Sequence, residues 1–422
     1  MTHVLVVGGG IAGLAAAQRL RERGGEQVRV TVVEQTGRLG GKIRTEEFAG
    51  RPIESGAETF LVRRDEGVDL ARKVGLGEQL AHPAALPPGL AVAGAVRDLP
   101  RRTVMGVPAD AADVAEIVGA DGRKRMASEP DSGEPLLGAE EDVSVGRLVR
   151  GRFGDEVVDR LVDPLLGGVY AGRADDLSLE ATVPALAAAA RKHSTLAGAV
   201  RQCLPAPAGK TPAPVFGTIQ GGLSRMVDAA ADAARADVRL GLPVRELLRV
   251  PHGWRAVVGD TRAPQVIEAD AVVLAVPARP AARLLADLSS TASAAIGELD
   301  YASVALVALA LPAADLPRRS GILVPAVEGF GVKAATFFNR KWPHIDSGEL
   351  SLVRASVGRY GEESLLQRDD ADLAALAHAE LSTLLGERLP QPAETAVHRW
   401  GGGLPQYGPG HADRIRRARA AL

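Results

Sequence analysis

The sequence contains one cysteine, Cys203, among its 422 residues. A single thiol cannot form a disulfide within the chain, and it cannot supply the several cysteines of a zinc-ribbon or iron–sulfur site. We therefore predict no metal site. Cys203 borders a proline-rich stretch at 205–214, which we interpret as a linker, and we expect its thiol to have no chemical role.

Aromatic residues are also scarce, with 7 Phe, 3 Trp and 4 Tyr, and neither sign of charge dominates a chain whose formal net charge is −2. A near-neutral chain has no basic field to attract nucleic acid, so we exclude nucleic acid as a partner. The longest apolar run, 302–314, is shorter than the roughly 18–20 residues of a membrane-spanning helix. The N-terminus lacks the features of a secretory signal. We expect a cytoplasmic protein, and peripheral contact with the inner face of the membrane stays open.

Glycine and apolar residues are abundant by contrast, at 48 glycines and 46% hydrophobic residues. This composition is typical of a globular protein, and the length allows two or three domains. Residues 3–7 are apolar and largely β-branched, glycines follow, and residues 11–23 carry apolar side chains at helical spacing. Residues 28–33 form a second apolar run. The first 34 residues therefore predict a βαβ unit that starts a parallel sheet.

The rest of the chain predicts helices first and strands later. Residues 105–205 are expected to be largely helical, with an exposed acidic loop at 129–135, and a further helix is expected at 222–235. Short apolar segments with turns between them predict an antiparallel sheet. These segments lie at 238–244, 254–258, 271–275, 304–309, 321–325 and 351–357. The predicted fold class is α/β, and α+β overall.

The strongest motif is Gly8-x-Gly10-x-x-Gly13, which lies between the first predicted strand and helix, with Glu34 at the end of the second strand. This arrangement is the fingerprint of a dinucleotide-binding fold. The glycines permit a tight turn and let backbone N–H groups approach a pyrophosphate at the helix N-terminus. Glu34 would accept hydrogen bonds from the adenosine ribose. The motif predicts NAD or FAD as cofactor.

Residues just after Glu34 favour FAD. A second glycine turn, Gly40-Gly41, stands between two cations, Arg38 and Lys42, and suits an extended cofactor that passes a second backbone loop. Taken alone, these two cations are more often solvated charges. The segment 54–59, E-S-G-A-E-T, offers a further close backbone approach that a flat flavin ring would need.

Nearly the whole chain resembles the bacterial coproporphyrinogen III and protoporphyrinogen oxidases, FAD-dependent enzymes of the amine-oxidase-like superfamily. The glycine-rich blocks at 8–14 and 38–45 are shared with amine oxidases and carotenoid desaturases, so they indicate only the cofactor class. More specific are G-V-Y-A-G at 168–172 with L-S at 177–178, and P-Q-Y-G-P-G-H at 405–411. Further matching blocks are E-S-G-A-E-T-F-L at 54–61, V-M-G-V-P at 104–108, F-G-D-E-V-V at 153–158, Q-G-G-L at 220–223 and R-K-W-P-H at 340–344.

The resemblance implies a Rossmann-like FAD-binding domain built from discontinuous segments, a substrate domain with an antiparallel sheet, and a helical domain. We expect the FAD-binding domain at 1–85, 206–285 and 399–422, the substrate domain at 86–104 and 286–398, and the helical domain at 105–205. In the family another FAD-binding segment follows the block at 405–411. We therefore expect 399–422 to be only the start of that last segment.

The resemblance also assigns site residues. It implies that the glycine loop and the acid after it hold the ADP half of FAD, that a second loop lines the riboflavin half, and that Val244 contacts the adenine. The expected cofactor-binding residues are Gly8, Gly9, Gly10, Ile11, Ala12, Gly13, Glu34, Gln35, Arg38, Gly41, Lys42, Gly56, Ala57, Glu58, Thr59, Val244 and Trp400. The expected substrate-binding residues are Arg63, Arg64, Gly168 and Leu323. Without the resemblance, Trp400 would be core packing, the two arginines a solvated pair and Leu323 a plain strand residue.

The reaction implied is six-electron oxidation of coproporphyrinogen III in heme biosynthesis, by three hydride transfers to flavin N5, with O2 reduced to H2O2. No side chain is expected to act as the catalytic group, because the flavin carries the chemistry. Substrate carboxylates predict cations at the pocket mouth, and a hand-off of product to ferrochelatase is possible. Three alternatives stay open: protoporphyrinogen IX as substrate, an FAD-dependent amine oxidase, and a flavin-binding partner protein without turnover. The scarce aromatics count against the amine oxidase.

Overall fold

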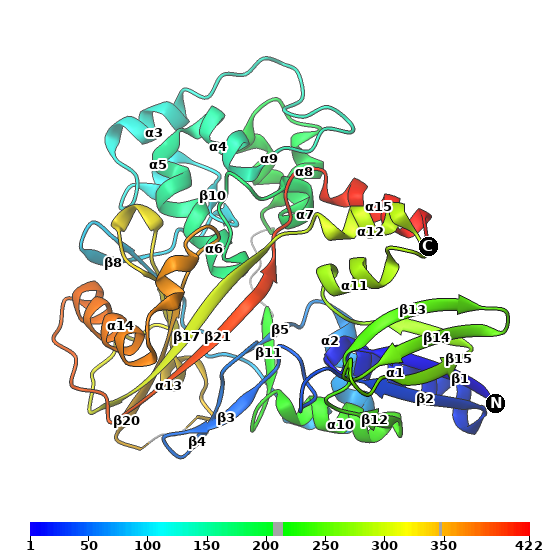
Figure 1. Cartoon of the computed structure of the whole chain (residues 1–422). Helices are drawn as coiled ribbons and strands as arrows, with labels where there is room; N and C mark the ends of the chain where they lie inside the picture. The colour runs from blue at the N-terminus through cyan, green and yellow to red at the C-terminus, as the bar shows by residue number, and fades with distance from the viewer. Residues whose placement is uncertain (206–213, 346–347) are drawn as a thin grey trace. The chain divides into compact units, whose positions relative to one another are not determined.

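The computed structural model describes residues 1–205, 214–345 and 348–422 (Figure 1). It divides into two compact units, which we describe separately. The first unit contains Met1–His82, Pro214–Leu299 and Arg414–Leu422, and the second contains Pro83–Ala213 and Asp300–Asp413. The predicted linker at 205–214 lies almost entirely outside the described residues.

A four-stranded parallel sheet forms the centre of the first unit. Its strands are ordered β12 (Asp237–Arg239), β2 (Val28–Val33), β1 (Thr2–Val7) and β16 (Ala271–Leu274). The helix α1 (Ile11–Gly24) connects β1 to β2, which confirms the predicted βαβ unit. Because β1 is covered on both faces, five consecutive residues of it are buried, as its continuous apolar run requires.

Two further layers cover this parallel sheet. On one side α1 packs against α10 (Ser224–Ala234), where a helix was predicted. On the other, the antiparallel strands β13 (Val244–Val250), β14 (Gly253–Val258) and β15 (Gln265–Ala269) share a hydrophobic core with β1 (Figure 1). The prediction of one strand over 238–244 is wrong, since Gly241 adopts φ +70 and turns the chain between β12 and β13.

Smaller elements complete the first unit. The hairpin of β3 (Thr45–Phe48) and β4 (Arg51–Glu54) follows the second glycine turn. The remaining elements are β5 (Phe60–Leu61), α2 (Asp65–Lys73), β6 (Leu80–Ala81), β11 (Phe216–Ile219), α11 (Ala278–Leu285) and α12 (Ser290–Gly297). Strand β11 lies between β5 and β6 in a three-stranded antiparallel sheet.

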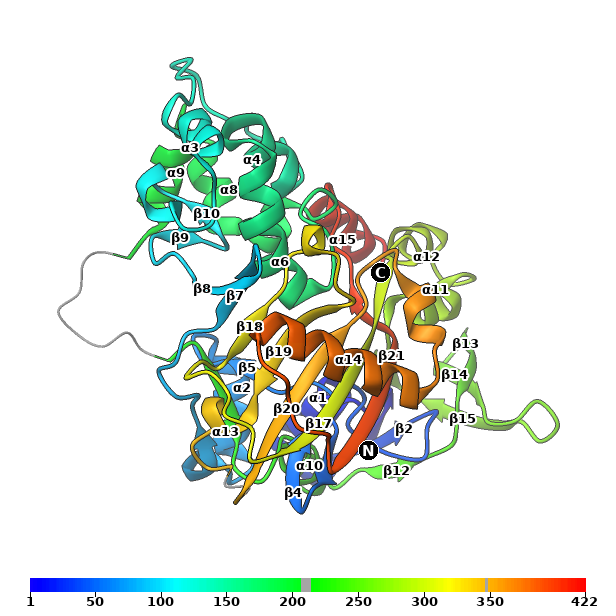
Figure 2. The same cartoon turned by 90° about the vertical axis from the view of Figure 1, so that its left-hand side faces the viewer.

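A seven-stranded sheet dominates the second unit and confirms the antiparallel sheet predicted from 304–309, 321–325 and 351–357. The prediction is wrong for 271–275, which forms β16 and pairs in parallel with β1, and 254–258 lies in the separate sheet of β13, β14 and β15. All neighbouring strands are antiparallel except β18 and β7, which are parallel. The order is β21 (Glu394–Pro405), β17 (Tyr301–Pro312), β20 (Leu350–Val357), β19 (Val332–Phe337), β18 (Gly321–Leu323), β7 (Gly89–Val92) and β8 (Ala95–Asp98). Figure 2 shows α14 (Asp370–Leu385) across the strands, and its apolar side chains share a core with β17 and β19. The long apolar run at 302–314 is mostly β17.

The helical part of the second unit lies in the region where helices were predicted. Its helices are α3 (Ala120–Ala127), α4 (Val145–Phe153), α5 (Asp155–Val157), the π-helical turn η4 (Val158–Val162), α6 (Asp163–Tyr170), α7 (Leu179–Thr182), α8 (Pro184–Ala190) and α9 (Leu196–Cys203). They enclose a core that includes Phe153, Leu161 and Leu166, all fully buried. The acidic segment before α4 is mostly exposed, as predicted.

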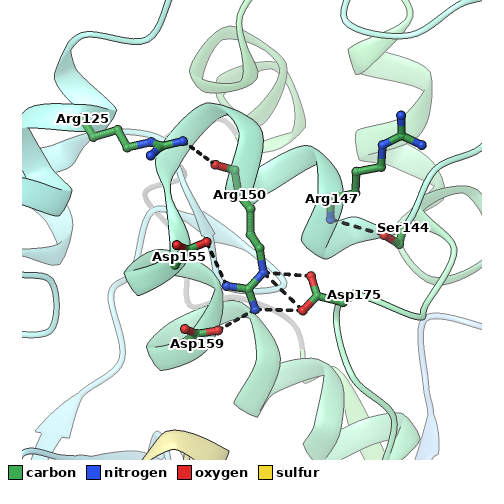
Figure 3. Close-up of polar contacts among 7 residues, drawn as sticks. All are labelled: Arg125, Ser144, Arg147, Arg150, Asp155, Asp159 and Asp175. Carbon is green, nitrogen blue, oxygen red and sulfur yellow. Dashed lines mark hydrogen bonds and ion pairs between the residues drawn. The ribbon is translucent and has the colours of Figure 1, made fainter.

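The Arg150 guanidinium connects several of these helices (Figure 3). Its Nε lies 2.9 Å from Asp175 Oδ1, and its Nη2 lies 2.8 Å from Asp175 Oδ2 and 2.6 Å from Asp159 Oδ1. Asp155 Oδ1 is 3.2 Å from Nη1. The hydrogen bonds with Asp175 raise the pKa of Arg150 above its already high value. One cation thus joins α4 to α5, to η4 and to the loop after α6.

Two units do not coincide with three predicted domains, and that domain division stays a prediction. Residues 286–299, which we assigned to the substrate domain, lie in the first unit. Residues 399–413, which we assigned to the last FAD segment, lie in the second, where β21 pairs with β17. Among the described residues, no helix combines the length and the apolar character needed to cross a membrane.

We predict that Arg150→Met destabilises the protein by about 1–3 kcal/mol, because Asp159 and Asp175 would lose their common partner and repel each other. Thermal unfolding at low salt measures the change. Arg147→Met on the same helix is the matched control, since the Arg147 side chain is exposed and points away from this cluster. Equal melting temperatures for the two variants would contradict the prediction.

Candidate functional site

The glycine loop between β1 and α1 contains two kinds of glycine. A Cβ on Gly8, whose φ is +109, would lie 2.4 Å from the carbonyl oxygen of Ala275, and a Cβ on Gly13 would lie 1.9 Å from that of Gly8. Both are therefore required by protein packing. Gly10 differs, because its Cβ would meet only the Cα of Gly41, at 3.8 Å. The space in front of Gly10, at the helix N-terminus, fits the approach of a pyrophosphate.

The first turn of α1 presents the donors that a pyrophosphate needs. Ile11 and Ala12 begin the helix, where backbone N–H groups have no partner within the helix. Gly9 N–H points instead to Glu34, whose Oε2 accepts it at 2.8 Å. The three residues therefore differ: Ile11 and Ala12 begin α1, where their anion-binding role stays a prediction, whereas Gly9 holds the loop through Glu34.

Glu34 is buried at the end of β2, with 8% of its surface exposed. Its Oε1 accepts hydrogen bonds from Thr36 N–H and Thr36 Oγ1, both at 2.8 Å. A carboxylate offers about four acceptor positions, so capacity remains for ribose hydroxyls. Sequence reasoning predicted only the ribose role and missed that Glu34 also holds the glycine loop through Gly9. Gln35, the next residue, is exposed.

The Arg38 guanidinium donates hydrogen bonds to backbone carbonyls of the second glycine turn. Its Nη2 donates to Gly41 O at 2.6 Å, and its Nη1 donates to the carbonyls of Leu39 and Ile43 at 3.0 and 3.1 Å. Burial lowers the pKa of Arg38. Gly40 N–H donates to Gly9 O at 2.9 Å, so the two glycine turns touch. Arg38 therefore fixes the conformation of the Gly40-Gly41 turn by binding the backbone carbonyls around it.

A third segment, 56–59, lies against the second glycine turn. Ala57 N–H donates to Lys42 O at 2.9 Å, which places the segment 56–59 beside Lys42. Burial lowers the pKa of Lys42. Glu58 is buried, Gly56 and Thr59 are half-buried and Ala57 is exposed, so the segment combines anchored and accessible positions.

Sequence reasoning missed how the Q-G-G-L block contributes. Its Leu223 N–H donates to buried Glu54 Oε1 at 2.6 Å, and Ser224 N–H donates to Thr45 Oγ1 at 3.0 Å. A Cβ on Gly222 would lie 2.2 Å from Thr45 Cγ2, so the block must carry glycine there. The resemblance had marked these residues, but it did not show that they hold the β3–β4 hairpin.

Val244 is buried at the start of β13. Two residues earlier, Leu242 N–H donates to Glu34 O at 2.9 Å, so this strand begins close to the end of β2. The position suits a contact with the adenine, which stays a prediction. Arg63 and Arg64 are exposed in the turn between β5 and α2, and neither guanidinium has a hydrogen-bond partner in the described part of the chain.

Gly168, Leu323 and Trp400 lie in the second unit. A Cβ on Gly168 in α6 would lie 3.0 Å from Leu323 Cδ2, so the two predicted pocket-wall residues touch. Trp400 lies opposite Val304 in the sheet and packs in a small cluster with Ala171. Their contacts with substrate or flavin stay predictions.

The two family-specific blocks are bonded to each other. Gln406 Nε2 donates to Tyr170 O at 2.8 Å, and Ser178 N–H donates to Tyr407 O at 2.7 Å. The rings of Tyr170 and Tyr407 meet edge to face, with centroids 5.8 Å apart. A Cβ on Gly172 would lie 2.2 Å from Gln406 Oε1. These blocks, 236 residues apart between Tyr170 and Gln406, form one structural element.

The described residues include no group of three or more His, Cys, Asp or Glu side chains arranged to hold a metal ion. Cys203 ends α9, where its Sγ donates to Ala185 O at 3.3 Å. Burial raises the pKa of the Cys203 thiol, which disfavours the reactive thiolate.

Comparisons with known proteins extend over the whole chain. The family model described as "Flavin containing amine oxidoreductase" matches residues 11–422. The coproporphyrinogen III oxidase of Mycobacterium tuberculosis (strain H37Rv) is 39% identical over 423 residues, covering 99% of this chain and 90% of that protein. The protoporphyrinogen oxidase of Homo sapiens is 30% identical over 458 residues, covering 99% and 91%.

A crystal structure from Exiguobacterium sp. 255-15, provisionally named a protoporphyrinogen oxidase, has the same fold. It superposes with a TM-score of 0.86 at 28% identity, covering 100% of this chain and 91% of that one. The predicted fold class is confirmed, and so is the resemblance to porphyrinogen oxidases.

We predict that Gly10→Val lowers the FAD content of the purified protein to less than roughly a tenth, because the side chain would occupy the space expected for the pyrophosphate. The melting temperature of the cofactor-free protein should stay unchanged, since Gly10 has φ −72 and open space before it. Flavin absorbance and thermal unfolding measure the two effects.

Two other glycine variants serve as comparisons for Gly10→Val. Gly13→Ala should destabilise the fold itself, because of the 1.9 Å approach to Gly8 O. Gly151→Ala, with nothing within 4 Å, should leave FAD content unchanged and should not lower the melting temperature, because alanine favours the helix α4 more than glycine does. Normal FAD content in Gly10→Val would show that the cofactor does not lie in front of Gly10.

Proposed function

The chain belongs to the family of flavin-containing amine oxidoreductases, and we propose that it oxidises coproporphyrinogen III to coproporphyrin III in heme biosynthesis. The observation that carries this proposal is the 39% identity, over 99% of the chain, to the mycobacterial enzyme of that name. Family membership confirms two predictions, that the chain is an oxidoreductase and that its cofactor is FAD.

The proposed reaction removes six electrons from the macrocycle in three two-electron rounds. FAD, when bound, would supply the hydride-accepting chemistry at N5, with three O2 as final acceptors and three H2O2 as products for the six electrons. The chain's own residues would hold the cofactor through the loop around Gly10 and Glu34. Arg63 and Arg64 have exposed guanidinium groups that can meet substrate carboxylates.

Protoporphyrinogen IX is the alternative substrate, and the human relative's name supports it. The two porphyrinogens differ in carboxylate number, four propionates against two, so charge recognition would decide between them. The greater identity to the mycobacterial protein favours the substrate with four.

The amine oxidase alternative finds little support in the second unit. We argued that such an enzyme would frame its amine between paired aromatic rings. Tyr170 and Tyr407 do pair, but their edge-to-face contact leaves no space for an amine between them. A flavin-binding partner without turnover would still hold FAD, so only an activity measurement separates it from the enzyme.

Three associations are part of the proposal. O2 serves as electron acceptor, the product passes to ferrochelatase, and the protein is cytoplasmic with peripheral contact at the inner face of the membrane. The lack of a membrane-crossing helix among the described residues is compatible with this last proposal.

We predict that FAD-loaded protein oxidises coproporphyrinogen III with a kcat/KM at least about ten-fold above that for protoporphyrinogen IX, because two more carboxylates can pair with cations. Porphyrin fluorescence follows product formation, and a peroxide assay should give three H2O2 per porphyrin.

A higher kcat/KM for protoporphyrinogen IX would reverse the substrate assignment. Peroxide release from a simple diamine such as putrescine would revive the amine oxidase. An FAD-loaded protein inactive on all three would support the non-catalytic alternative.

A further inference from the structure

Phe216 is the only exposed aromatic residue in the described part of the chain. That part contains all 7 Phe, 3 Trp and 4 Tyr, and Phe216 alone among them is exposed, with 40% of its surface accessible. An apolar side chain in this state forgoes the free energy that burial would provide. Apolar residues that gather on a surface mark interaction sites, so the neighbours of Phe216 decide its meaning.

Phe216 has an exposed apolar partner on the neighbouring strand. It begins β11 and lies opposite Leu61 of β5, which is 36% exposed. Directly opposed residues of an antiparallel pair point to the same face of the sheet, so the two side chains are neighbours. Further along this face, Thr218 and the opposite Ala81 are buried, so the exposure is confined to one end. We call Leu61 and Phe216 the apolar platform.

The opposite face of the same strands belongs to the core of the first unit. Phe60 packs there against the cluster around Ile219, and a Cβ on Gly67 of α2 would lie 2.7 Å from Phe60 Cδ2. Since successive residues of a strand point to opposite faces, the platform is directed away from this core. Outward positions of an antiparallel sheet commonly carry polar residues, and here they carry leucine and phenylalanine.

Two arginines without a partner follow the platform directly. Arg64 N–H donates to Leu61 O at 3.3 Å, so residues 61–64 form a tight turn at the end of β5. Arg63 and Arg64 are both exposed, and neither guanidinium forms a hydrogen bond or an ion pair within residues 1–205, 214–345 and 348–422. The acids that come next, Asp65 and Glu66, lie in the first turn of α2, where the helix dipole favours them.

The platform also continues from the segment that we expect to line the riboflavin half of FAD. Leu61 is two residues after Thr59, which is about 7 Å along an extended chain. The segment itself is fixed to the second glycine turn, because Ala57 N–H donates to Lys42 O at 2.9 Å. An exposed apolar surface and two free cations therefore lie within one unit, next to the expected cofactor segment.

We propose that one face of the tetrapyrrole substrate lies on Phe216 and Leu61, while Arg63 and Arg64 receive its carboxylates. This inference rests on the proposed function, which supplies a ligand that joins pyrrole rings to propionates. The surface offers the matching groups, an aromatic ring with an aliphatic neighbour beside two guanidinium groups. A polyamine would be repelled by the same two cations. Phe216 is thus a positioning residue that acts on substrate binding.

Phe216→Ala is the first test. We expect a KM for coproporphyrinogen III about ten-fold higher, with kcat and FAD absorbance unchanged. The melting temperature should stay the same, because the lost side chain is exposed. Phe216→Trp keeps an aromatic ring and should keep the KM of wild type. Leu248→Ala, which removes an equally exposed apolar residue from β13 of the same unit, is the control.

Salt separates the apolar part of the surface from its charged part. Fluorescence of coproporphyrin III measures its affinity for the FAD-loaded protein. The affinity lost in Phe216→Ala should be equal at about 0.05 M and about 0.5 M NaCl, because an apolar contact is not screened. The double variant Arg63→Met/Arg64→Met should lose about ten-fold in affinity at the lower salt concentration and much less at the higher one. Leu61→Ala should weaken binding about three-fold, and it tests the platform independently of Phe216.

The binding measurement also separates this proposal from the proposed function. If wild type binds coproporphyrin III but turns over no porphyrinogen, the proposed function fails, and the affinities of the variants alone judge the platform. Unchanged affinity in both Phe216→Ala and Leu61→Ala would overturn the proposal. Absence of porphyrin binding by wild type, or an equal loss in Leu248→Ala, would overturn it as well.

Discussion

The carboxylate of Glu34 is the interaction on which the cofactor half of the structure depends. It directly follows β2, accepts the N–H of Gly9, and accepts both donors of Thr36. Gly9 in turn accepts the N–H of Gly40 through its carbonyl, so the position of the second glycine turn follows from that of the first. The residue expected to bind ribose thus also fixes the two loops between which an extended dinucleotide would pass. Its buried charge is satisfied by these donors before any ligand arrives.

Local patterns made the first half of this arrangement predictable. The apolar run of β1, the helical spacing of α1 and the glycine spacing between them depend only on neighbours in sequence, so they could be predicted together. One segment was an exception. The segment 238–244 has the composition of one strand, yet Gly241 turns the chain, because β12 completes the parallel sheet and β13 begins a different one.

Long-range polar contacts could not be predicted in this way. Nothing near Arg150 in sequence indicates that Asp175 would be its main partner, and nothing near Tyr170 indicates Gln406. Sequence blocks at 168–172 and 405–411 pointed to the family, but only the fold shows why they occur together: one block supplies backbone acceptors and glycine space, and the other supplies the amide that fills it. Periodicity reports burial, whereas such pairings depend on the path of the whole chain.

Two buried or half-buried cations of the second unit, Arg150 and Lys333, differ in how they are paired with carboxylates. Arg150 has three carboxylates, which is more than its charge requires, and it joins α4 to α5, to η4 and to the loop after α6. Lys333 is buried, and its ammonium group makes no hydrogen bond or ion pair among the described residues, while the one carboxylate whose charge acts on it, Glu362, pairs with two arginines. A structural role explains the first arrangement, because every donor that holds the helices is used. It does not explain the second, in which apolar substitution would relieve the burial cost. The difference in pairing, and not burial alone, separates a cation that stabilises the fold from one whose burial costs stability.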